Sequence, residues 1–304
     1  MIIDIHSHAW PTAEVDSSRF LNDITRVKAK PIEPVSSYDR YRATAASCDV
    51  TVVFGGKARL TDFWVEDRVV ADYVAQDPAC LIGFMSLDPT QPGWQEEMRY
   101  GHQALGLKGI KLMPAYAGFF PQDPALDPLW TYAQKHCLPV LVHTGTAFTT
   151  KAVIDCALPR NLDDVSRRFP EVRITMTHLG HPYEAECLAI IRKQPHVYAD
   201  ISDMHNRPWQ LFHSLMLVHE YGAWDKLFFG SNYPFTTVDE TLAGLKSLCN
   251  INMDRFSIPR EKIEEVIHRD ALACLNLACP DHSKRVVQPR FDEPVPEVQV
   301  SIAY

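Results

Sequence analysis

Residues 138–145 read Leu138-Pro139-Val140-Leu141-Val142-His143-Thr144-Gly145, a short apolar run that ends at a histidine and a glycine. The run does not alternate between apolar and polar residues, which is typical of a strand buried on both faces of a parallel sheet. Other stretches share this character, and we expect strands at 2–5, 50–54, 81–86, 109–112, 139–143, 172–177, 197–201 and 226–230. Their starts lie about 25–50 residues apart, which indicates strand–helix units rather than hairpins.

Helix-start signals lie between these runs. Asn161 precedes an acidic turn and is expected to cap a helix. Thr237 and Glu240 fit a capping box. Pro259 suits the first turn of a helix whose apolar residues recur at helical spacing, namely Ile263, Val266 and Ile267. Eight strands alternating with helices predict an α/β protein, a (β/α)8 TIM barrel in a single domain. An open doubly wound sheet is the alternative, but no glycine-rich turn follows the first strand to support a dinucleotide site.

Two segments do not follow the alternation. Residues 9–37 form a long connection after the first strand, and we expect a loop that covers the barrel mouth and shapes substrate access. Residues 280–304 contain several prolines and no helical period. We therefore expect a barrel domain over 1–279 and an extended tail that packs on the barrel or reaches a second subunit of a homodimer.

Composition restricts the class of protein. Of 304 residues, 46% are apolar and 22% charged, which are ordinary globular values. The net charge is −8 and no basic stripe is present, which argues against nucleic acid as a partner. No apolar run is long enough to span a membrane, and the first residues do not resemble a secretory signal. The 8 cysteines show no CxxC spacing. We expect reduced thiols in a cytoplasmic protein.

Histidines gather at the ends of the expected strands. His6 and His8 are two residues apart, so on one strand they point the same way, into the mouth where such barrels keep their active sites. His143 and His178 end two further strands on the same side. Four histidines at three strand ends predict a site for Zn²⁺ or a similar divalent ion such as Mn²⁺.

Lys111 lies near the end of the expected fourth strand, 109–112. As an ammonium it would stabilise developing negative charge. It could instead be carbamylated and bridge two metals, or simply pair with a neighbouring carboxylate. Lys108, three residues earlier, is expected to be solvated.

Other residues are expected to face the mouth. Asn232 follows the eighth strand. Trp10, Tyr116 and Phe119 lie on mouth-side loops, with Phe120 beside them, and are expected to line a pocket for a planar or apolar substrate, although ordinary loop packing is the alternative for each. Two polar residues, Asp203 and His205, follow the seventh strand.

The sequence resembles the amidohydrolase superfamily, closest to the branch that includes aminocarboxymuconate-semialdehyde decarboxylase. The resemblance covers about residues 1–278. It is carried by motifs in the same order as in that branch: His6-Ser7-His8, Gly109-Ile110-Lys111, Val142-His143-Thr144-Gly145, His178-Leu179-Gly180-His181-Pro182 and Gly230-Ser231-Asn232-Tyr233-Pro234.

The resemblance implies a TIM barrel with a divalent metal, often zinc. His6, His8 and His143 match ligand positions, and His178 matches the residue that orients the activated water or assists proton transfer. The position of Asn232 is usually an aspartate that serves as ligand and general acid/base. The role of the family's aspartate therefore does not apply to this chain, and Asn232 could serve at most as a neutral ligand.

The leading hypothesis is a metal-dependent hydrolase that acts on a small carboxylate-bearing lactone, ester or amide through a metal-activated water. Lys111 would hold the oxyanion or a substrate carboxylate. The rival is a non-oxidative decarboxylase of the same branch. A third hypothesis, favoured by Asn232, is a catalytically weak barrel that only binds metal or ligand.

Overall fold

The computed structural model describes residues 1–10, 18–28, 36–254 and 256–281. Eight parallel strands form one sheet in the order β1-β2-β5-β6-β7-β8-β9-β10. Their bounds are β1 Ile3–His8, β2 Val50–Phe54, β5 Leu81–Leu87, β6 Ile110–Leu112, β7 Val140–Val142, β8 Ile174–Met176, β9 Val197–Asp200 and β10 Leu227–Phe228. Each strand begins and ends within a few residues of the stretch expected for it. The prediction of a (β/α)8 barrel is therefore confirmed.

The barrel closes between β1 and the residues that follow β10. The backbone N–H of Ile5 donates to the carbonyl of Phe229 (3.2 Å), and that of His8 donates to Tyr233 (2.8 Å). Ser7 and Tyr233 form a parallel bridge. This seam brings the first and eighth strand ends together, so residues far apart in sequence share one mouth.

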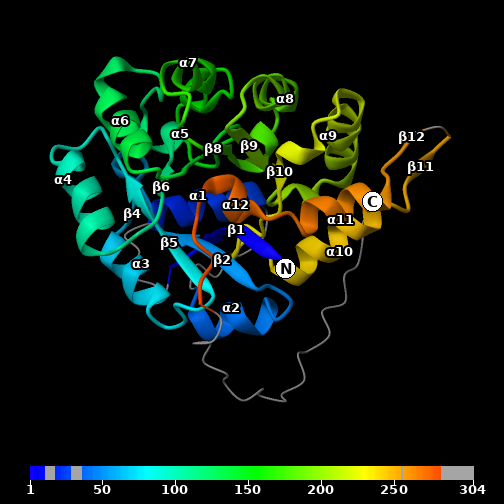
Figure 1. The fold of residues 1–304 in the computed structure, drawn as a ribbon, viewed down its shortest axis with the longest axis horizontal. Helices are drawn as coiled ribbons and strands as arrows, with labels where there is room; N and C mark the ends of the chain where they lie inside the picture. Colours follow the sequence, from blue (N-terminus) through cyan, green and yellow to red (C-terminus); the bar gives the residue numbers. More distant parts are fainter. Residues whose placement is uncertain (11–17, 29–35, 255, 282–304) are drawn as a thin grey trace.

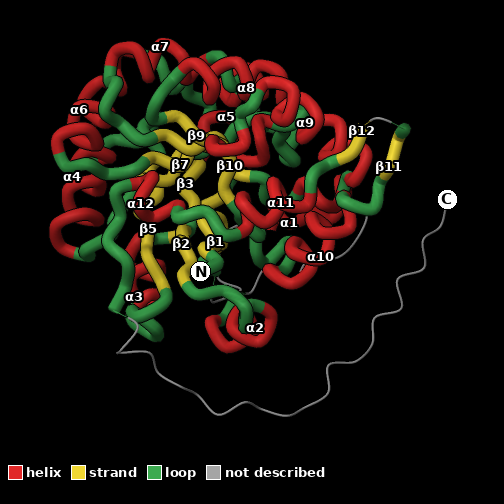
Figure 2. Tube along the Cα trace, turned by 45° about the vertical axis from the view of Figure 1, so that its right-hand side comes forward, coloured by secondary structure: helices red, strands yellow, loops and turns green. Residues whose placement is uncertain are grey.

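Helices surround the strands (Figures 1 and 2). Their bounds are α1 Ser18–Lys28, α2 Tyr38–Thr44, α3 Asp67–Val74, α4 Trp94–Arg99, α5 Pro114–Ala117, α6 Asp127–Lys135, α7 Asn161–Arg168, α8 Glu184–Lys193, α9 Pro208–Tyr221, α10 Val238–Leu248, α11 Arg260–Ile267 and α12 Ala271–Leu275. Two short hairpins complete the described chain: β3 Gly56–Ala58 with β4 Phe63–Val65, and β11 Asn252–Met253 with β12 Phe256–Ser257. The second hairpin projects from the side of the barrel in Figure 1.

The expected helix starts are mostly present. Thr237 and Glu240 form the capping box of α10, and Pro259 immediately precedes α11. The cap assigned to Asn161 is wrong, because Arg160 already has helical dihedrals and Asn161 is the first residue of α7. Its side-chain amide instead donates to the carbonyl of Asp155 (2.6 Å).

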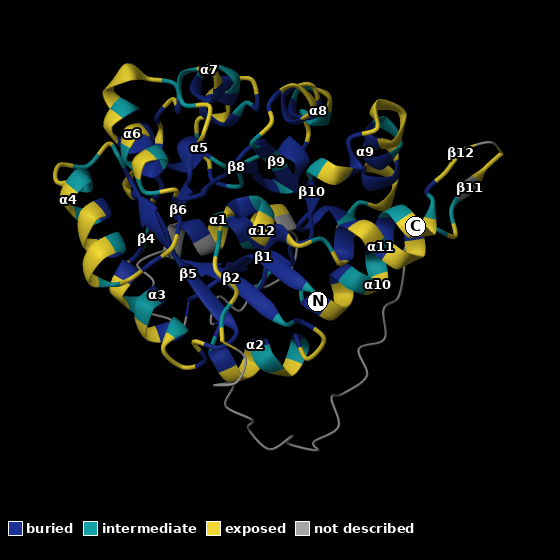
Figure 3. Ribbon diagram, in the orientation of Figure 1, coloured by how far each residue is buried: buried dark blue, intermediate teal, exposed yellow. Residues whose placement is uncertain are grey.

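The buried apolar residues form two clusters, and Figure 3 shows the barrel strands almost entirely in the colour of buried residues. Inside the barrel, Leu272 and Leu275 of α12 pack against apolar strand residues such as Ile3 and Val50. Arg173, just before β8, donates to the carbonyl of Cys274 (3.1 Å), so α12 covers the end where the strands begin. The opposite end, where the carboxyl ends of the strands meet, is left for the site.

The connection after β1 is not a plain loop, because α1 lies within it. Residues 11–17 and 29–35 of that connection lie outside the described residues, as does the expected tail from 282 onward. All eight cysteines lie in the described ranges, and none of them forms a disulfide there. Within the described ranges, no helix combines the length and the apolar character that crossing a membrane requires.

Candidate functional site

A small cavity lies at the carboxyl ends of the strands and collects the predicted site residues except Phe119 and Phe120. Those it collects are His6, His8, Trp10, Lys111, Tyr116, His143, His178 and Asn232, and Phe20, Met113, Phe148 and Phe235 complete the lining. Phe119 is buried but lies outside this lining, and Phe120 is exposed. The space open to the centres of water-sized molecules is about 30 Å³. This holds one or two waters, so an organic substrate must displace part of the wall.

A β-bulge brings His6 and His8 to the cavity. The pairing of β1 with β2 shifts register between Asp4 and Ser7. Within this irregularity the backbone N–H of His6 donates to Oδ1 of Asp4 (3.0 Å) instead of to the neighbouring strand. Bulges re-aim side chains next to active sites, and here the two imidazole rings lie 5.4 Å apart between centroids.

Asp4 also holds the seam of the barrel. Its carboxylate accepts from the backbone N–H (2.9 Å) and from the hydroxyl (2.6 Å) of Ser231, the residue before Asn232. Burial raises the pKa of Asp4 to about 7, although the hydrogen bonds from Ser231 act in the opposite direction. The same carboxylate therefore positions the start of His6-Ser7-His8 and the turn that carries Asn232.

Gly145 allows the loop after β7 to fold back on His143. Its φ is +88°, and a Cβ there would lie 1.9 Å from the carbonyl oxygen of His181. No other residue fits this position without moving the backbone. The turn lets the Thr146 N–H donate to that carbonyl (2.8 Å), and Nε2 of His143 donates to the Thr146 carbonyl (2.8 Å).

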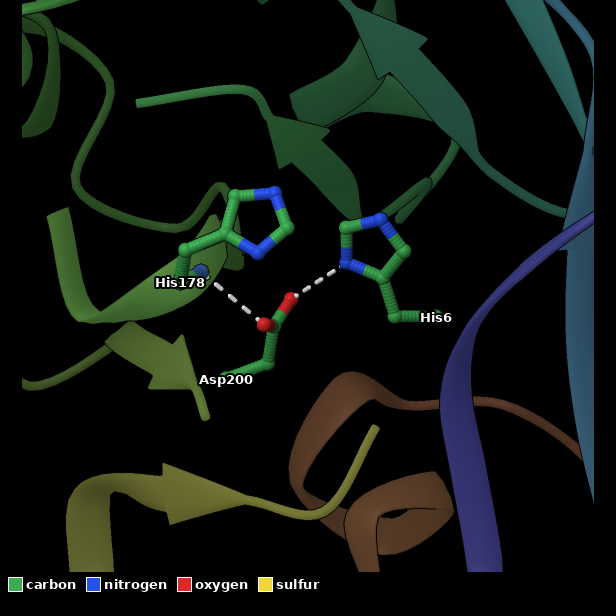
Figure 4. A group of neighbouring side chains, drawn as sticks. All are labelled: His6, His178 and Asp200. Atoms are coloured by element: carbon green, nitrogen blue, oxygen red, sulfur yellow. Dashed lines mark hydrogen bonds and ion pairs between the residues drawn. The ribbon is translucent and has the colours of Figure 1, made fainter. Parts of the chain in front are cut away.

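His178 follows β8 in a left-handed backbone conformation, with φ of 55°. Its backbone N–H donates to Oδ1 of Asp200 (3.0 Å), the last residue of β9. Its Nδ1 lies 3.0 Å from the carbonyl of Ser202 and 2.9 Å from the hydroxyl of the same residue. These contacts hold the ring in place, and Figure 4 shows the backbone contact with Asp200.

Asn232 faces the cavity, as predicted. Its φ of 63° lies in the left-handed region, which asparagine and aspartate tolerate better than most residues. Its backbone N–H donates to the His6 carbonyl (2.8 Å). Nε2 of His8 lies 3.1 Å from its side-chain oxygen Oδ1, so the amide touches a histidine of the cluster directly.

The four histidines form a continuous cluster. His178 lies between His6 and His143, with ring centroids 4.9 Å and 5.4 Å apart. Burial lowers the pKa of His6 to about 3 and holds the pKa values of His8 and His143 well below the usual range. Burial also lowers the pKa of His178. All four rings are therefore neutral near pH 7, the form in which imidazole binds metals.

Lys111 reaches the same cavity from β6. The hypothesis that it pairs with a carboxylate is wrong within the described part of the chain, where the buried Nζ has no hydrogen-bond partner. The amine lies 4.5 Å from the centroid of the Phe54 ring. Burial lowers the pKa of Lys111 to about 7, although the charge of Asp200 acts in the opposite direction. A buried amine without a partner leaves room for an anionic group.

Aromatic rings cover the rest of the wall. Trp10 lies 4.3 Å from the His8 ring, and Tyr116 lies 5.0 Å from the His143 ring. Phe20 of α1 stacks on Phe63 with centroids 4.3 Å apart. An adjoining cavity shares His143, His178 and Asn232 and extends toward Asp203 and Arg207.

A divalent ion fits the donor set. A nitrogen of His6, a nitrogen of His178 and a carboxylate oxygen of Asp200 all lie within 4.8 Å of one another. Neutral imidazoles and carboxylates suit Zn²⁺ and several other divalent ions. Asp200 and Ser202 were not identified from the sequence. The available signal was an aspartate at the end of an otherwise apolar strand, Val197-Tyr198-Ala199-Asp200.

Comparison with known proteins gives a family and a fold. The family model described as amidohydrolase matches residues 3–262, and comparison with curated protein sequences gives no match. An uncharacterised TIM-barrel protein from Bordetella bronchiseptica has a TM-score of 0.68 at 19% identity, covering 90% of this chain and 99% of that one.

Two structures of similar enzymes also match. A dihydroxybenzoic acid decarboxylase from Polaromonas, with bound manganese and an inhibitor, has a TM-score of 0.63 at 14% identity, covering 90% of this chain and 96% of that one. A probable 2-pyrone-4,6-dicarboxylic acid hydrolase from Acinetobacter baumannii has a TM-score of 0.61 at 14% identity, covering 91% and 99%. At these identities the likeness concerns the fold.

Proposed function

The chain belongs to the amidohydrolase family, and from this premise we propose that it is a metal-dependent hydrolase of a small carboxylate-bearing lactone, ester or amide. The observation that carries the proposal is the amine of Lys111, which shares a cavity with four histidines and finds no hydrogen-bond partner among the described residues. The histidines suit a metal, and the amine suits an anionic group of the substrate.

His6, His8 and His143 are the residues that would hold the metal. They come from two strand ends, and the burial that lowers their pKa values keeps them neutral and able to bind near pH 7. The ion would polarise a substrate carbonyl and promote the ionisation of a water molecule. Zn²⁺ is the first choice for such a set, and Mn²⁺ is the second to test.

His178 is the residue that would move a proton. The carbonyl of Ser202 faces its Nδ1 at 3.0 Å, and a carbonyl oxygen only accepts hydrogen bonds. The proton of the neutral ring therefore lies on Nδ1, and Nε2 is free to take a proton from the attacking water. Asn232 cannot perform this step, because its amide does not titrate.

Lys111 would bind the substrate's carboxylate. A hydrogen bond to a charged group contributes roughly 1.5–3 kcal/mol, so its loss should weaken substrate binding by about 10–100-fold. The aromatic wall of Trp10, Tyr116 and Phe148 would enclose the apolar part of the same molecule. Together they favour a small organic acid over a neutral ester.

The test is a pH-stat assay on a panel of lactones, esters and amides, each with and without a carboxylate. Protein stripped with chelator should be inactive, and Zn²⁺ or Mn²⁺ should restore acid release from the carboxylate-bearing substrates. Lys111→Met should raise KM about 10–100-fold for these substrates. The matched control is Lys108→Met, because Lys108 is exposed on the same segment and should change little.

Two results would overturn the proposal. Release of carbon dioxide in place of acid would make the protein a decarboxylase. No turnover of any substrate by fully metal-loaded protein would make it a binding barrel. Equal KM values for the two lysine variants would show that Lys111 does not bind the substrate.

A further inference from the structure

We propose that Asp200 is a positioning residue that holds the ring proton of His6 on Nδ1, so that the unprotonated Nε2 of His6 is the atom presented to the cavity. That this nitrogen binds a metal is an inference that rests on the proposed function. The position of the ring proton is independent of that function, because it follows from hydrogen bonds within the chain.

The contact between Asp200 and His6 determines which ring nitrogen of His6 carries the proton. Oδ2 of Asp200 lies 2.9 Å from Nδ1 of His6, and both side chains are buried (Figure 4). A carboxylate accepts hydrogen bonds and donates none. A neutral imidazole carries one N–H, so that N–H must be at Nδ1, and Nε2 keeps its lone pair.

Ser202 supports the same arrangement. Its hydroxyl donates to Oδ1 of Asp200 (2.5 Å), and a serine has only one hydroxyl proton. The oxygen of Ser202 can therefore only accept from Nδ1 of His6, 3.1 Å away, and from Nδ1 of His178, 2.9 Å away. Both rings then carry their protons on Nδ1, which leaves Nε2 of each ring unprotonated.

The other carboxylate oxygen of Asp200, Oδ1, holds the backbone of His178 and Ser202 in place. Oδ1 accepts from the backbone N–H groups of His178 (3.0 Å) and Ser202 (3.1 Å). His178 has a left-handed backbone, which is unfavourable for a residue with a Cβ. One carboxylate thus connects β1, the turn after β8 and the end of β9.

These contacts favour a positioning role over direct metal ligation. An ionised carboxylate has about four lone-pair sites. His6, the His178 backbone, the Ser202 backbone and the Ser202 hydroxyl already supply four donors. Three of these donors lie on Oδ1 and one on Oδ2, so an ion at Oδ2 would have to share that oxygen with the Nδ1–H of His6. A carboxylate that accepts from a metal-binding histidine fixes its tautomer and raises its basicity.

The test is Asp200→Asn, which keeps the shape and removes one acceptor. Three donors hold the amide oxygen at the Oδ1 position, so the NH₂ group faces Nδ1 of His6 and requires that nitrogen to accept. The proton of His6 should therefore move to Nε2. In metal-free protein labelled with ¹⁵N-histidine, the parent should show the Nδ1–H form of His6, assigned with His6→Gln, and the variant the Nε2–H form.

The matched control is Ser202→Ala, which removes the hydroxyl but leaves Oδ2 of Asp200 as acceptor. Its His6 should remain Nδ1–H. Loss of an outer carboxylate partner typically lowers metal affinity by roughly 10–100-fold, so Asp200→Asn should bind Zn²⁺ about that much more weakly than the parent. Ser202→Ala should change affinity less.

Each outcome separates the possibilities. An Nε2–H form of His6 in the metal-free parent overturns the inference even if Asp200→Asn does not fold. Weaker Zn²⁺ binding by Asp200→Asn with an unchanged His6 tautomer makes Asp200 a ligand and also overturns it. The expected tautomer change in a protein that neither retains metal nor hydrolyses any substrate refutes the proposed function and leaves the role of Asp200 intact.

Discussion

Asn232 stands where the resemblance to the amidohydrolase superfamily implies an aspartate, and its contact with His8 makes the consequence of that difference measurable. Its oxygen Oδ1 lies 3.1 Å from Nε2 of His8. Aspartate adopts the same left-handed backbone and would place a full charge where a dipole now lies. Asn232→Asp should therefore fold normally and bind Zn²⁺ more tightly, by about tenfold or more, in competition with a chelator.

The matched control for that change is Asn276→Asp. Asn276 also has a left-handed backbone, with φ of 56°, but it ends α12 at the opposite end of the barrel. It should leave metal affinity unchanged. Equal affinity of Asn232→Asp and the parent at several pH values would mean that Asn232 only shapes its turn.

At single positions, the sequence predicted cavity residues where a polar residue lies near the end of a strand. His6, His143 and Lys111 were identified because strand ends in a barrel converge on one mouth, and all three line the cavity. Asp200 was missed because its role depends on a hydrogen bond to a residue 194 positions away. Phe119 was misjudged because a loop residue's direction cannot be derived from its position in the chain.

At the scale of elements, the capping box of α10 is a local device that stabilises the chain after the Asn232 turn. Thr237 Oγ accepts from the backbone N–H of Glu240 (3.1 Å), and the Glu240 carboxylate accepts from the backbone N–H of Thr237 (2.8 Å). Thr237→Ala should lower the free energy of unfolding by about 0.5–2 kcal/mol, measured by urea denaturation.

Ser247→Ala in the last turn of the same helix is the control, because its hydroxyl only bonds to the Gly244 carbonyl. It should stay within about 0.5 kcal/mol of the parent. If both variants lose equal stability, the capping box is not what stabilises this helix.

The eight barrel strands could be predicted because each is a distinct apolar run, whereas other elements carry weaker signals. The strands of the β3–β4 hairpin have only three residues each, too few to show a period. α1 lies in a connection whose length suggested a loop. Phe20 of α1 lines the cavity, but the part played by residues 9–37 in substrate access stays a prediction.

At the scale of the whole molecule, the two ends of the barrel differ in composition. One end is filled by apolar side chains, and the candidate site lies at the other. α12 fills the end where the strands begin with apolar side chains, while the opposite end collects buried histidines, an amine and an amide in a cavity of about 30 Å³. A fold optimised only for stability would not bury so many polar groups at one end. Because the histidines come from β1 and the ends of β7 and β8, a bound ion would connect separate parts of the sheet.

The most direct test of this account is the metal content of the purified protein after dialysis against metal-free buffer, measured by inductively coupled plasma mass spectrometry. We expect about one equivalent of a divalent metal in the parent and in His178→Ala, which should lose turnover but keep the ion. The combined His6→Ala, His8→Ala and His143→Ala variant should lose the metal while its circular dichroism spectrum stays that of a folded barrel. A folded triple variant that retains the metal at the parent's level would contradict the account.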